Sequence, residues 1–127
     1  MKNSKDPRHI RRIHNMQAIF AYSCGSGITE SKDGVEIVDN LKEIDDFISQ
    51  NAPKWPLDKI NKVDLSILRT AIWELLHQPA TPPKVVIDEA IEMAKEFGTE
   101  SSAPFINGVL GSVIKNLNLT NLETNNG

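Results

Sequence analysis

The residues with the clearest chemical potential form a basic cluster near the amino terminus. The cluster consists of Arg8, Arg11 and Arg12, with His9 between them. Positions three and four apart share one face of a helix, so these guanidinium groups should project together. A guanidinium pairs with phosphate through its planar fork and also stacks on flat groups. The cluster therefore predicts contact with a nucleic-acid backbone, although a frayed and solvated terminus would explain the same residues.

The charge distribution concentrates basic residues in this segment. Residues 1–14 contain Lys2, Lys5, Arg8, Arg11 and Arg12 against Asp6 alone. The whole chain nevertheless has a formal net charge of −3, so the remainder is acidic. An acidic body with one basic end is not typical of a general polyanion binder. It indicates a protein that touches phosphates at one end.

Residues suited to catalysis or metal binding are sparse. The single cysteine, Cys24, excludes an internal disulfide and a cysteine-based zinc site. No Gly-rich phosphate loop and no cluster with metal-ligand spacing occurs. The remaining imidazoles and carboxylates fit helix ends or solvated helix faces: His14, His77, Asp45, Asp46, Glu89, Glu92 and Glu96. We therefore expect no enzymatic activity, no cofactor and no metal.

The length and composition predict one small domain. A chain of 127 residues has room for a single core, and a hydrophobic content of 39% is ordinary for a folded protein. No apolar run approaches the roughly 20 residues of a membrane span, and the amino terminus lacks the apolar stretch of a secretory signal. These features predict a cytoplasmic location without membrane contact.

Helical periodicity dominates the pattern of apolar residues. It predicts an all-α fold, a compact single-domain bundle of five to seven helices. A helix should begin at Asp6–Pro7 and end at Gly25–Gly27, followed by a polar loop over 25–34. Further helices are predicted over 35–50, over 57–77 as a short and then a longer helix, over 83–97, and from the 101–105 turn onward. Gly98 follows the last apolar residue of its helix, where we expect a left-handed cap.

Three stretches of sequence resemble those of a known family. Residues 82–98 read P-P-K-V-V-I-D-E-A-I-E-M-A-K-E-F-G, and residues 105–110 read F-I-N-G-V-L. Residues 63–76 read V-D-L-S-I-L-R-T-A-I-W-E-L-L, and the first helix contains M-Q-A-I-F-A-Y. Together they resemble the NusB family of transcription antitermination factors. His14 and Asn15 depart from the family pattern, and the segment between Tyr22 and Val35 is shorter than usual.

The resemblance implies a non-catalytic RNA-binding function. Members bind boxA-type single-stranded RNA together with NusE, a small-subunit ribosomal protein, and join the RNA polymerase elongation complex, notably on ribosomal RNA operons. Some self-associate, so a homodimer is a further expectation. For such a function the basic cluster of Arg8, His9, Arg11 and Arg12 would supply the cations that contact RNA phosphates. By family position, the resemblance places Phe105 and its preceding loop from Ser101 beside this cluster, and so assigns RNA contact to Ser101 and Phe105. It assigns partner contact to Phe20, Asp64 and Arg69.

Simpler roles are open for several of these residues. Phe105 and Phe20 also suit a core, and Asp64 also suits a helix cap. The whole domain would alternatively be a protein-interaction module in ribosome assembly without direct RNA binding. In either case we expect a basic flexible arm over 1–7, the domain over 8–118, and a disordered tail over 119–127.

Overall fold

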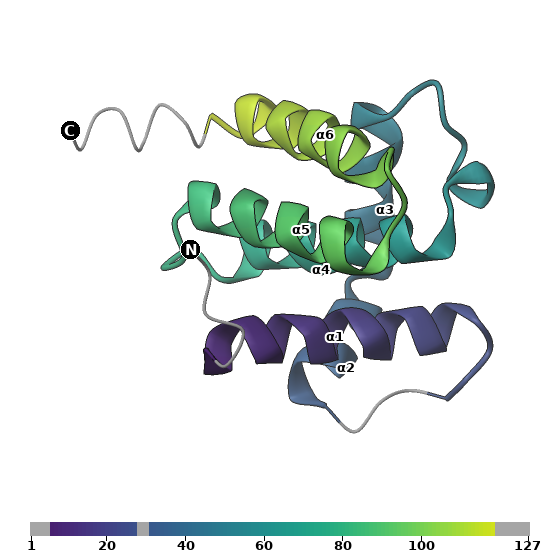
Figure 1. The fold of residues 1–127 in the computed structure, drawn as a ribbon, viewed down its shortest axis with the longest axis vertical. Coiled ribbons are helices and arrows are strands. Elements are labelled where there is room, and N and C mark those ends of the chain that lie inside the picture. The colour runs from purple at the N-terminus through teal and green to yellow at the C-terminus, as the bar shows by residue number, and fades with distance from the viewer. Residues whose placement is uncertain (1–5, 28–30, 119–127) are drawn as a thin grey trace.

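The computed structural model describes residues 6–27 and 31–118, and these ranges contain six α-helices, one 3-10 helix and no strand. The predicted all-α bundle is confirmed (Figure 1). Residues 1–5 of the predicted arm and the predicted tail over 119–127 lie outside the described residues.

The first helix begins and ends where the sequence predicts. Helix α1 spans Pro7–Ser23, and the Asp6 side chain caps it by accepting a hydrogen bond from the backbone N–H of Arg8 at 2.8 Å. Proline suits this first position because its missing N–H would have no partner inside the helix. Beyond the carboxyl end, Gly25 has a φ of +101°, a conformation that glycine adopts without steric cost.

The helix predicted over 35–50 is instead two helices. Helix α2 spans Lys32–Asp39 and helix α3 spans Leu41–Asn51, so α2 also begins inside the predicted loop. They part at Asn40, whose side chain donates to the carbonyl of Glu36 at 2.8 Å. Such local bonding by asparagine competes with the helical ladder. The break lets Ile37 and Ile44 both reach the core, where each is 0% exposed.

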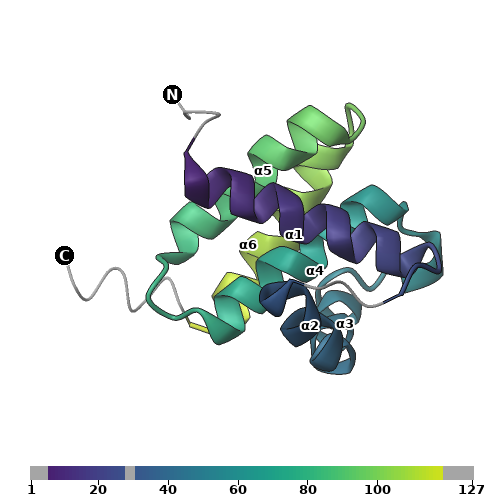
Figure 2. The same ribbon diagram turned by 90° about the horizontal axis from the view of Figure 1, so that it is seen from below.

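The remaining helices surround a central one. After the 3-10 helix η1 (Leu57–Lys59), helix α4 spans Lys62–His77 and packs against every other α-helix of the described chain. Its residues from Leu65 to Leu68 and from Thr70 to Leu75 are buried. A helix that is enclosed on all sides must be apolar nearly all round, which explains the pattern of 63–76. Figure 2 shows α1 crossing over α4, with α2 and α3 together at one side of the bundle.

The left-handed cap expected at Gly98, between the last two helices, is not present. Helices α5 (Pro83–Phe97) and α6 (Ser102–Asn116) pack against each other across a short turn. Gly98 has φ −97° and ψ −159°, so its backbone is not left-handed. Glycine is needed here because a Cβ atom would lie 2.7 Å from the Cβ of Ser102 and 2.8 Å from the carbonyl oxygen of Ala94.

We expect Gly98→Ala to lower the free energy of unfolding by about 1–3 kcal/mol, the usual cost of forcing atoms into a packed region. The matched control is Gly108→Ala in α6, where a Cβ would meet nothing within 4 Å. That change should be neutral or stabilising, because alanine favours helix interiors by about 1 kcal/mol over glycine. Urea unfolding of both variants measures the difference, and equal stabilities would contradict the close contact at Gly98.

No helix in the described ranges combines the length and the apolar character that crossing a membrane requires.

Candidate nucleic-acid interface

The start of α1 lies against the carboxyl-terminal half of α4 and the first turns of α5. As their spacing predicts, Arg8, Arg11 and Arg12 line one small hollow, and Trp73 of α4 forms part of its wall. The indole Nε1 of Trp73 is buried there without a hydrogen-bond partner. The spacing therefore predicted correctly that the three arginines lie together. It did not predict which residues of other helices lie opposite them.

Arg12 is held in a buried ion-pair network. Its side chain is only 12% exposed, and Nη2 donates to Oε2 of Glu74 at 2.6 Å while Nη1 donates to Oε1 of Glu89 at 3.0 Å. Hydrogen bonding to Glu74 raises the pKa of Arg12 above its ordinary value. The guanidinium thus joins α1 to both α4 and α5. In this arrangement the N–H groups of Arg12 bond to carboxylates inside the protein and stabilise the packing of the helices.

Arg8 and Arg11 face solvent. Arg8 is 81% exposed and pairs with Asp6 at 3.0 Å, and Arg11 is 60% exposed with Nη2 donating to Asp33 Oδ1 at 2.8 Å. Hydrogen bonds from Arg8 lower the pKa of Asp6 to about 2, and those from Arg11 lower the pKa of Asp33. The Arg8–Asp6 pair lies at the surface, where ion pairs contribute little. The Arg11–Asp33 pair is two-pronged, and the side chain of Asp33 is only 13% exposed. Both guanidinium groups are accessible to solvent and so to a phosphate.

His9 and Glu89 occupy places that the sequence did not indicate. His9 was predicted within the basic surface cluster, but it is 6% exposed and its Nδ1 lies 3.2 Å from Oε2 of Glu89. Glu89 was interpreted as part of a solvated helix face, and that interpretation is wrong because the residue is 4% exposed. Its helix turns this position toward α1, where it meets Arg12 and His9.

Ser101 and Phe105 do not lie beside the arginines. They line a separate cavity with Asp64, at the amino-terminal end of α4. Glu74, which holds Arg12, is ten residues further along the same helix, a separation of about 15 Å. The adjacency that the resemblance implied for Phe105 and the basic cluster is therefore wrong. The structure instead places Phe105 next to a residue assigned to partner contact.

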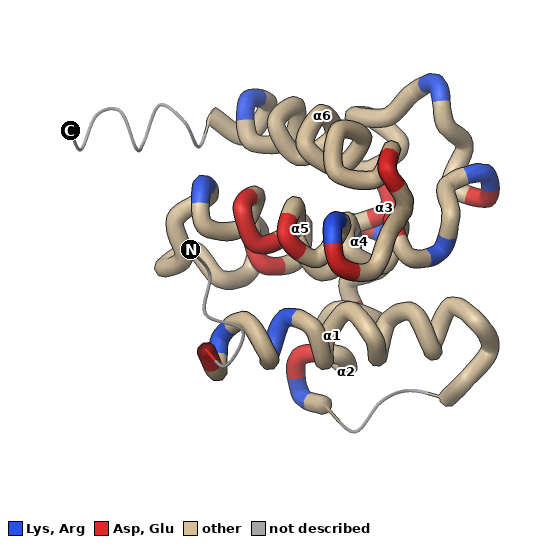
Figure 3. The backbone as a smooth tube through the Cα atoms, in the orientation of Figure 1, with Lys and Arg blue, Asp and Glu red and all other residues tan. Residues whose placement is uncertain are grey.

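Trp55 is the residue that the sequence analysis missed. It is 52% exposed and stands edge-on to Phe105, with ring centroids 6.3 Å apart and planes at 78°. The sequence holds a partial signal, because Pro53 and Pro56 on either side of Trp55 disfavour a helix and so place this residue in a connection between helices. Figure 3 shows basic positions along this connection between α3 and α4, far from the start of α1.

The position of Asp64 excludes the simple role of a helix cap. The cap of α4 is Asn61, whose side chain accepts from the backbone N–H of Asp64 at 2.8 Å. Asp64 itself is 6% exposed, and its Oδ1 is buried without a hydrogen-bond partner. The positive end of the helix dipole favours its charge but supplies no bond to that oxygen.

The other two residues assigned to partner contact, Phe20 and Arg69, do not line the cavity that contains Asp64. Phe20 is partly exposed and is not one of the side chains packed against the described core. Arg69 is largely buried and forms a two-pronged pair with Asp45 of α3, with both bonds at 2.9 Å. Arg69 also lines an open groove beside Tyr22 and Leu57. An aromatic side chain outside the core favours a contact role for Phe20.

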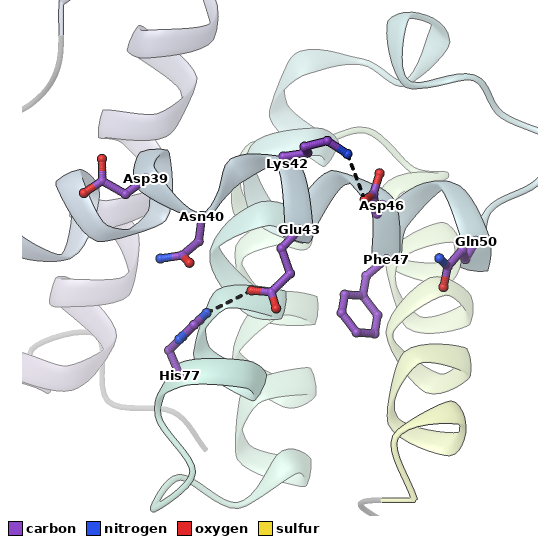
Figure 4. Close-up of a pocket in the computed structure, with 8 residues that line it drawn as sticks. All are labelled: Asp39, Asn40, Lys42, Glu43, Asp46, Phe47, Gln50 and His77. Atoms are coloured by element: carbon purple, nitrogen blue, oxygen red, sulfur yellow. Dashed lines mark hydrogen bonds and ion pairs between the residues drawn. The ribbon is translucent and has the colours of Figure 1, made fainter.

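The catalytic candidates form ordinary surface pairs. In the hollow on α3 shown in Figure 4, His77 Nε2 lies 3.2 Å from Glu43 Oε1 and Lys42 lies 3.5 Å from Asp46. Asp45, expected on a solvated face, is instead engaged by Arg69. Among the described residues, no group of three His, Cys, Asp or Glu side chains is arranged to hold a metal ion.

A sequence model of the NusB family matches residues 34–115, which is well over half of the 127-residue chain. The chain belongs to the NusB family. The matched range includes Trp55, Asp64 and Phe105, whereas the arginines of α1 lie outside it. The family assignment made from the sequence motifs is confirmed.

Curated NusB relatives and a solved NusB structure agree with this assignment. The Transcription antitermination protein NusB of Finegoldia magna is 47% identical over 81 residues, which cover 64% of this chain and 59% of the relative. The proteins of the same name from Treponema denticola and Thermotoga maritima are 47% and 48% identical, covering 60% and 62% of this chain. The matched segments span 56% of the length of each of those two relatives. The solved structure of T. maritima NusB aligns with a TM-score of 0.75 and 36% identity, covering 87% of this chain and 92% of that one.

Proposed function

We propose that this NusB-family chain is a transcription antitermination factor that binds boxA-type single-stranded RNA together with NusE. The complex would join the RNA polymerase elongation complex, notably on ribosomal RNA operons, without catalysing a reaction. The observation that carries the proposal is the family match over residues 34–115, with relatives named for antitermination. A cytoplasmic location follows from that role.

The surface chemistry of the described residues supports RNA binding. Single-stranded RNA needs cations for its phosphates and exposed planar side chains for its bases. Arg8 and Arg11 supply exposed cations at the start of α1. Trp55 and Phe105 supply rings at the other end of α4. An RNA strand that joins the two surfaces would run over the outside of the bundle, parallel to the buried α4, for about 15 Å, a distance that a few nucleotides cover.

NusE would dock near the carboxyl-terminal half of α1. Ribosomal proteins are generally basic, and complementary charge steers such docking. Phe20 offers partly exposed aromatic area, and the groove near Arg69 lies in the same region, lined by Tyr22 at the end of α1. Because Arg69 is already paired with Asp45, a partner would meet that pair rather than a free guanidinium. Self-association stays a prediction, which sedimentation velocity tests.

The test is the binding of boxA-type RNA by the full chain, with and without NusE, over a salt series. Arg8→Ala combined with Arg11→Ala should weaken binding and flatten its salt dependence by about 0.7 units of slope per lost phosphate contact. The matched control is Lys84→Ala with Lys95→Ala, which removes the same charge from the exposed face of α5. That control should leave the slope close to the wild-type value.

The rival function is a protein-interaction module in ribosome assembly. It would be favoured if the wild-type chain bound NusE but showed no salt-dependent affinity for RNA in either condition. Equal slopes for the Arg8/Arg11 variant and its lysine control would show that α1 does not contact phosphates. RNA recognition would then rest on the aromatic cavity alone.

A further inference from the structure

We propose that Asp33 of α2 is an autoinhibitory residue, which occupies the guanidinium of Arg11 and so lowers the affinity of the chain for RNA. This role rests on the proposed RNA-binding function and goes beyond it by naming a contact that opposes binding. Arg11 donates to the carboxylate of Asp33 through both Nε and Nη2, the second bond at 2.8 Å. Carboxylate and phosphate engage the same fork of a guanidinium, so a phosphate that binds Arg11 in this way must displace Asp33.

Every arginine of the basic cluster is already paired with carboxylates of the fold. The pairs are Arg8 with Asp6, Arg11 with Asp33, and Arg12 with Glu74 and Glu89. Three guanidinium groups therefore face four carboxylates, and the three arginines bring no excess of positive charge to this surface. Because a polyanion binds through uncompensated cations, RNA has to compete with these carboxylates.

The Arg11–Asp33 pair differs from the other two because its carboxylate is anchored while its guanidinium is accessible. Asp33 is 13% exposed and also accepts from Nδ2 of the buried Asn15 at 3.0 Å, whereas Arg11 is 60% exposed. Asp33 stands in the first turn of α2, where the helix dipole favours a negative charge. Hydrogen bonds from Arg11 and Asn15 lower the pKa of Asp33, so its carboxylate is ionised at neutral pH. The carboxylate is therefore in place when Arg11 meets RNA.

The pair can open without leaving a buried charge alone. If Arg11 turns to a phosphate, Asp33 keeps its bond from Asn15 and its place at the start of α2. Arg12 has no such freedom, because Glu74 would be left buried without the hydrogen bonds that Arg12 donates to it. Arg11 is therefore the arginine whose contact with RNA a nearby carboxylate can oppose without preventing it.

The surroundings of the pair favour a phosphate as the competitor of Asp33. Arg11, Lys32 and Asp33 line one hollow formed by α1 and the start of α2, together with His14 and Asn15. Lys32 is exposed. A phosphate that enters this hollow meets two cations opposed by one carboxylate. A neutral residue in place of Asp33 would remove that opposition.

Asp33 and Asn15 belong to the parts of the chain that depart from the family pattern. Asn15 is one of the departures in the first helix, and Asp33 lies in the shortened segment between Tyr22 and Val35. The family model begins at residue 34, just after Asp33. The autoinhibitory contact is therefore a property of this chain that the family pattern does not supply.

The test uses the full chain and labelled boxA-type RNA, with binding followed by fluorescence anisotropy at low salt. Asp33→Asn removes the charge but keeps an oxygen that can accept from Asn15. We expect this variant to bind the RNA about two- to fivefold more tightly than the wild-type chain, because binding no longer breaks a surface ion pair. The matched control is Glu36→Gln, which removes a carboxylate one turn further along α2. Its smaller gain measures the general effect of removing negative charge.

Substitution of Arg11 shows whether Asp33 acts through it. In the Arg11→Ala background, Asp33→Asn should give no more gain in RNA affinity than Glu36→Gln does, because the cation that Asp33 occupies is gone. Asp33→Ser is a second neutral variant, and its RNA affinity should match that of Asp33→Asn. Melting temperatures show whether each variant folds, and Arg11→Ala controls for lost stability because it breaks the same pair.

The outcomes separate this inference from the proposed function. If the wild-type chain binds boxA-type RNA but neither Asp33 variant exceeds Glu36→Gln in affinity, the autoinhibitory role is wrong and the proposed function stands. If Asp33→Asn folds but weakens RNA binding, Asp33 positions Arg11 for RNA and the inference is overturned. A gain that persists in the Arg11→Ala background overturns it as well, because Asp33 then does not act through Arg11. If neither the wild-type chain nor Asp33→Asn binds RNA with or without NusE, both the inference and the proposed function are overturned.

Discussion

Arg12→Ala is expected to lower the free energy of unfolding by about 3–5 kcal/mol, the usual result of removing one member of a buried ion pair. The alanine would leave the carboxylate of Glu74 buried at 8% exposure, without the three hydrogen bonds that Arg12 donates to it. It would also remove the bond to Glu89 that ties α1 to α5. Urea unfolding followed by circular dichroism measures the loss.

Arg8→Ala is the matched control for this prediction. Arg8 lies one helical turn before Arg12 and pairs with a carboxylate at the surface, so its removal should leave the free energy of unfolding nearly unchanged. If Arg12→Ala lowered the free energy of unfolding as little as Arg8→Ala does, the ion-pair network around Arg12 would not stabilise the fold. Arg12 would then be as free as its neighbours to contact RNA, as its position in the sequence predicted.

Phe105→Ala is expected to weaken RNA binding by about 1–3 kcal/mol, the worth of one base–aromatic contact. It should also lower stability, though by less than the roughly 3–5 kcal/mol of a fully buried phenylalanine, because Phe105 is only partly buried against the core. The ring also supports Trp55 at an edge-on contact of 6.3 Å, so its loss would loosen the other wall of the cavity.

Phe105→Leu separates the two effects. Leucine keeps most of the apolar contact with the core but removes the aromatic ring. We expect it to restore most of the stability and little of the RNA affinity, as measured by thermal melting and by fluorescence titration. Unchanged RNA affinity in both variants, with stability lost in the alanine variant alone, would assign Phe105 to the core.

Local sequence signals located most of the helices correctly. The Asp6–Pro7 start, the glycine-rich end of α1, the short helix before α4 and the proline start of α5 all appear as predicted. Each depends on the chemistry of residues a few positions apart, such as a capping side chain or a missing N–H group. The break at Asn40 was missed because apolar periodicity continues across it, and only one side-chain bond interrupts the ladder.

Local sequence patterns could not predict contacts between helices that are far apart in the chain. Periodicity correctly placed Arg8, Arg11 and Arg12 on one face, but it could not show that Glu74 and Glu89 face Arg12 from two other helices. It likewise gave no reason to bury Glu89, since an isolated glutamate is ordinarily solvated. The charge of that residue is tolerated in the core because a guanidinium from α1 lies 3.0 Å away and the ring of His9 lies 3.2 Å away.

The order of amino acids alone was enough to establish the fold class, the family and a basic surface at the start of α1. These properties follow from spacing and from motifs, which are local to the chain. Packing alone revealed the cavity, because Trp55, Asp64 and Phe105 belong to three segments that meet only when α3, α4 and α6 close on one another. The unpaired Oδ1 of Asp64 is likewise a property of the folded chain, since the unfolded chain leaves every carboxylate in water.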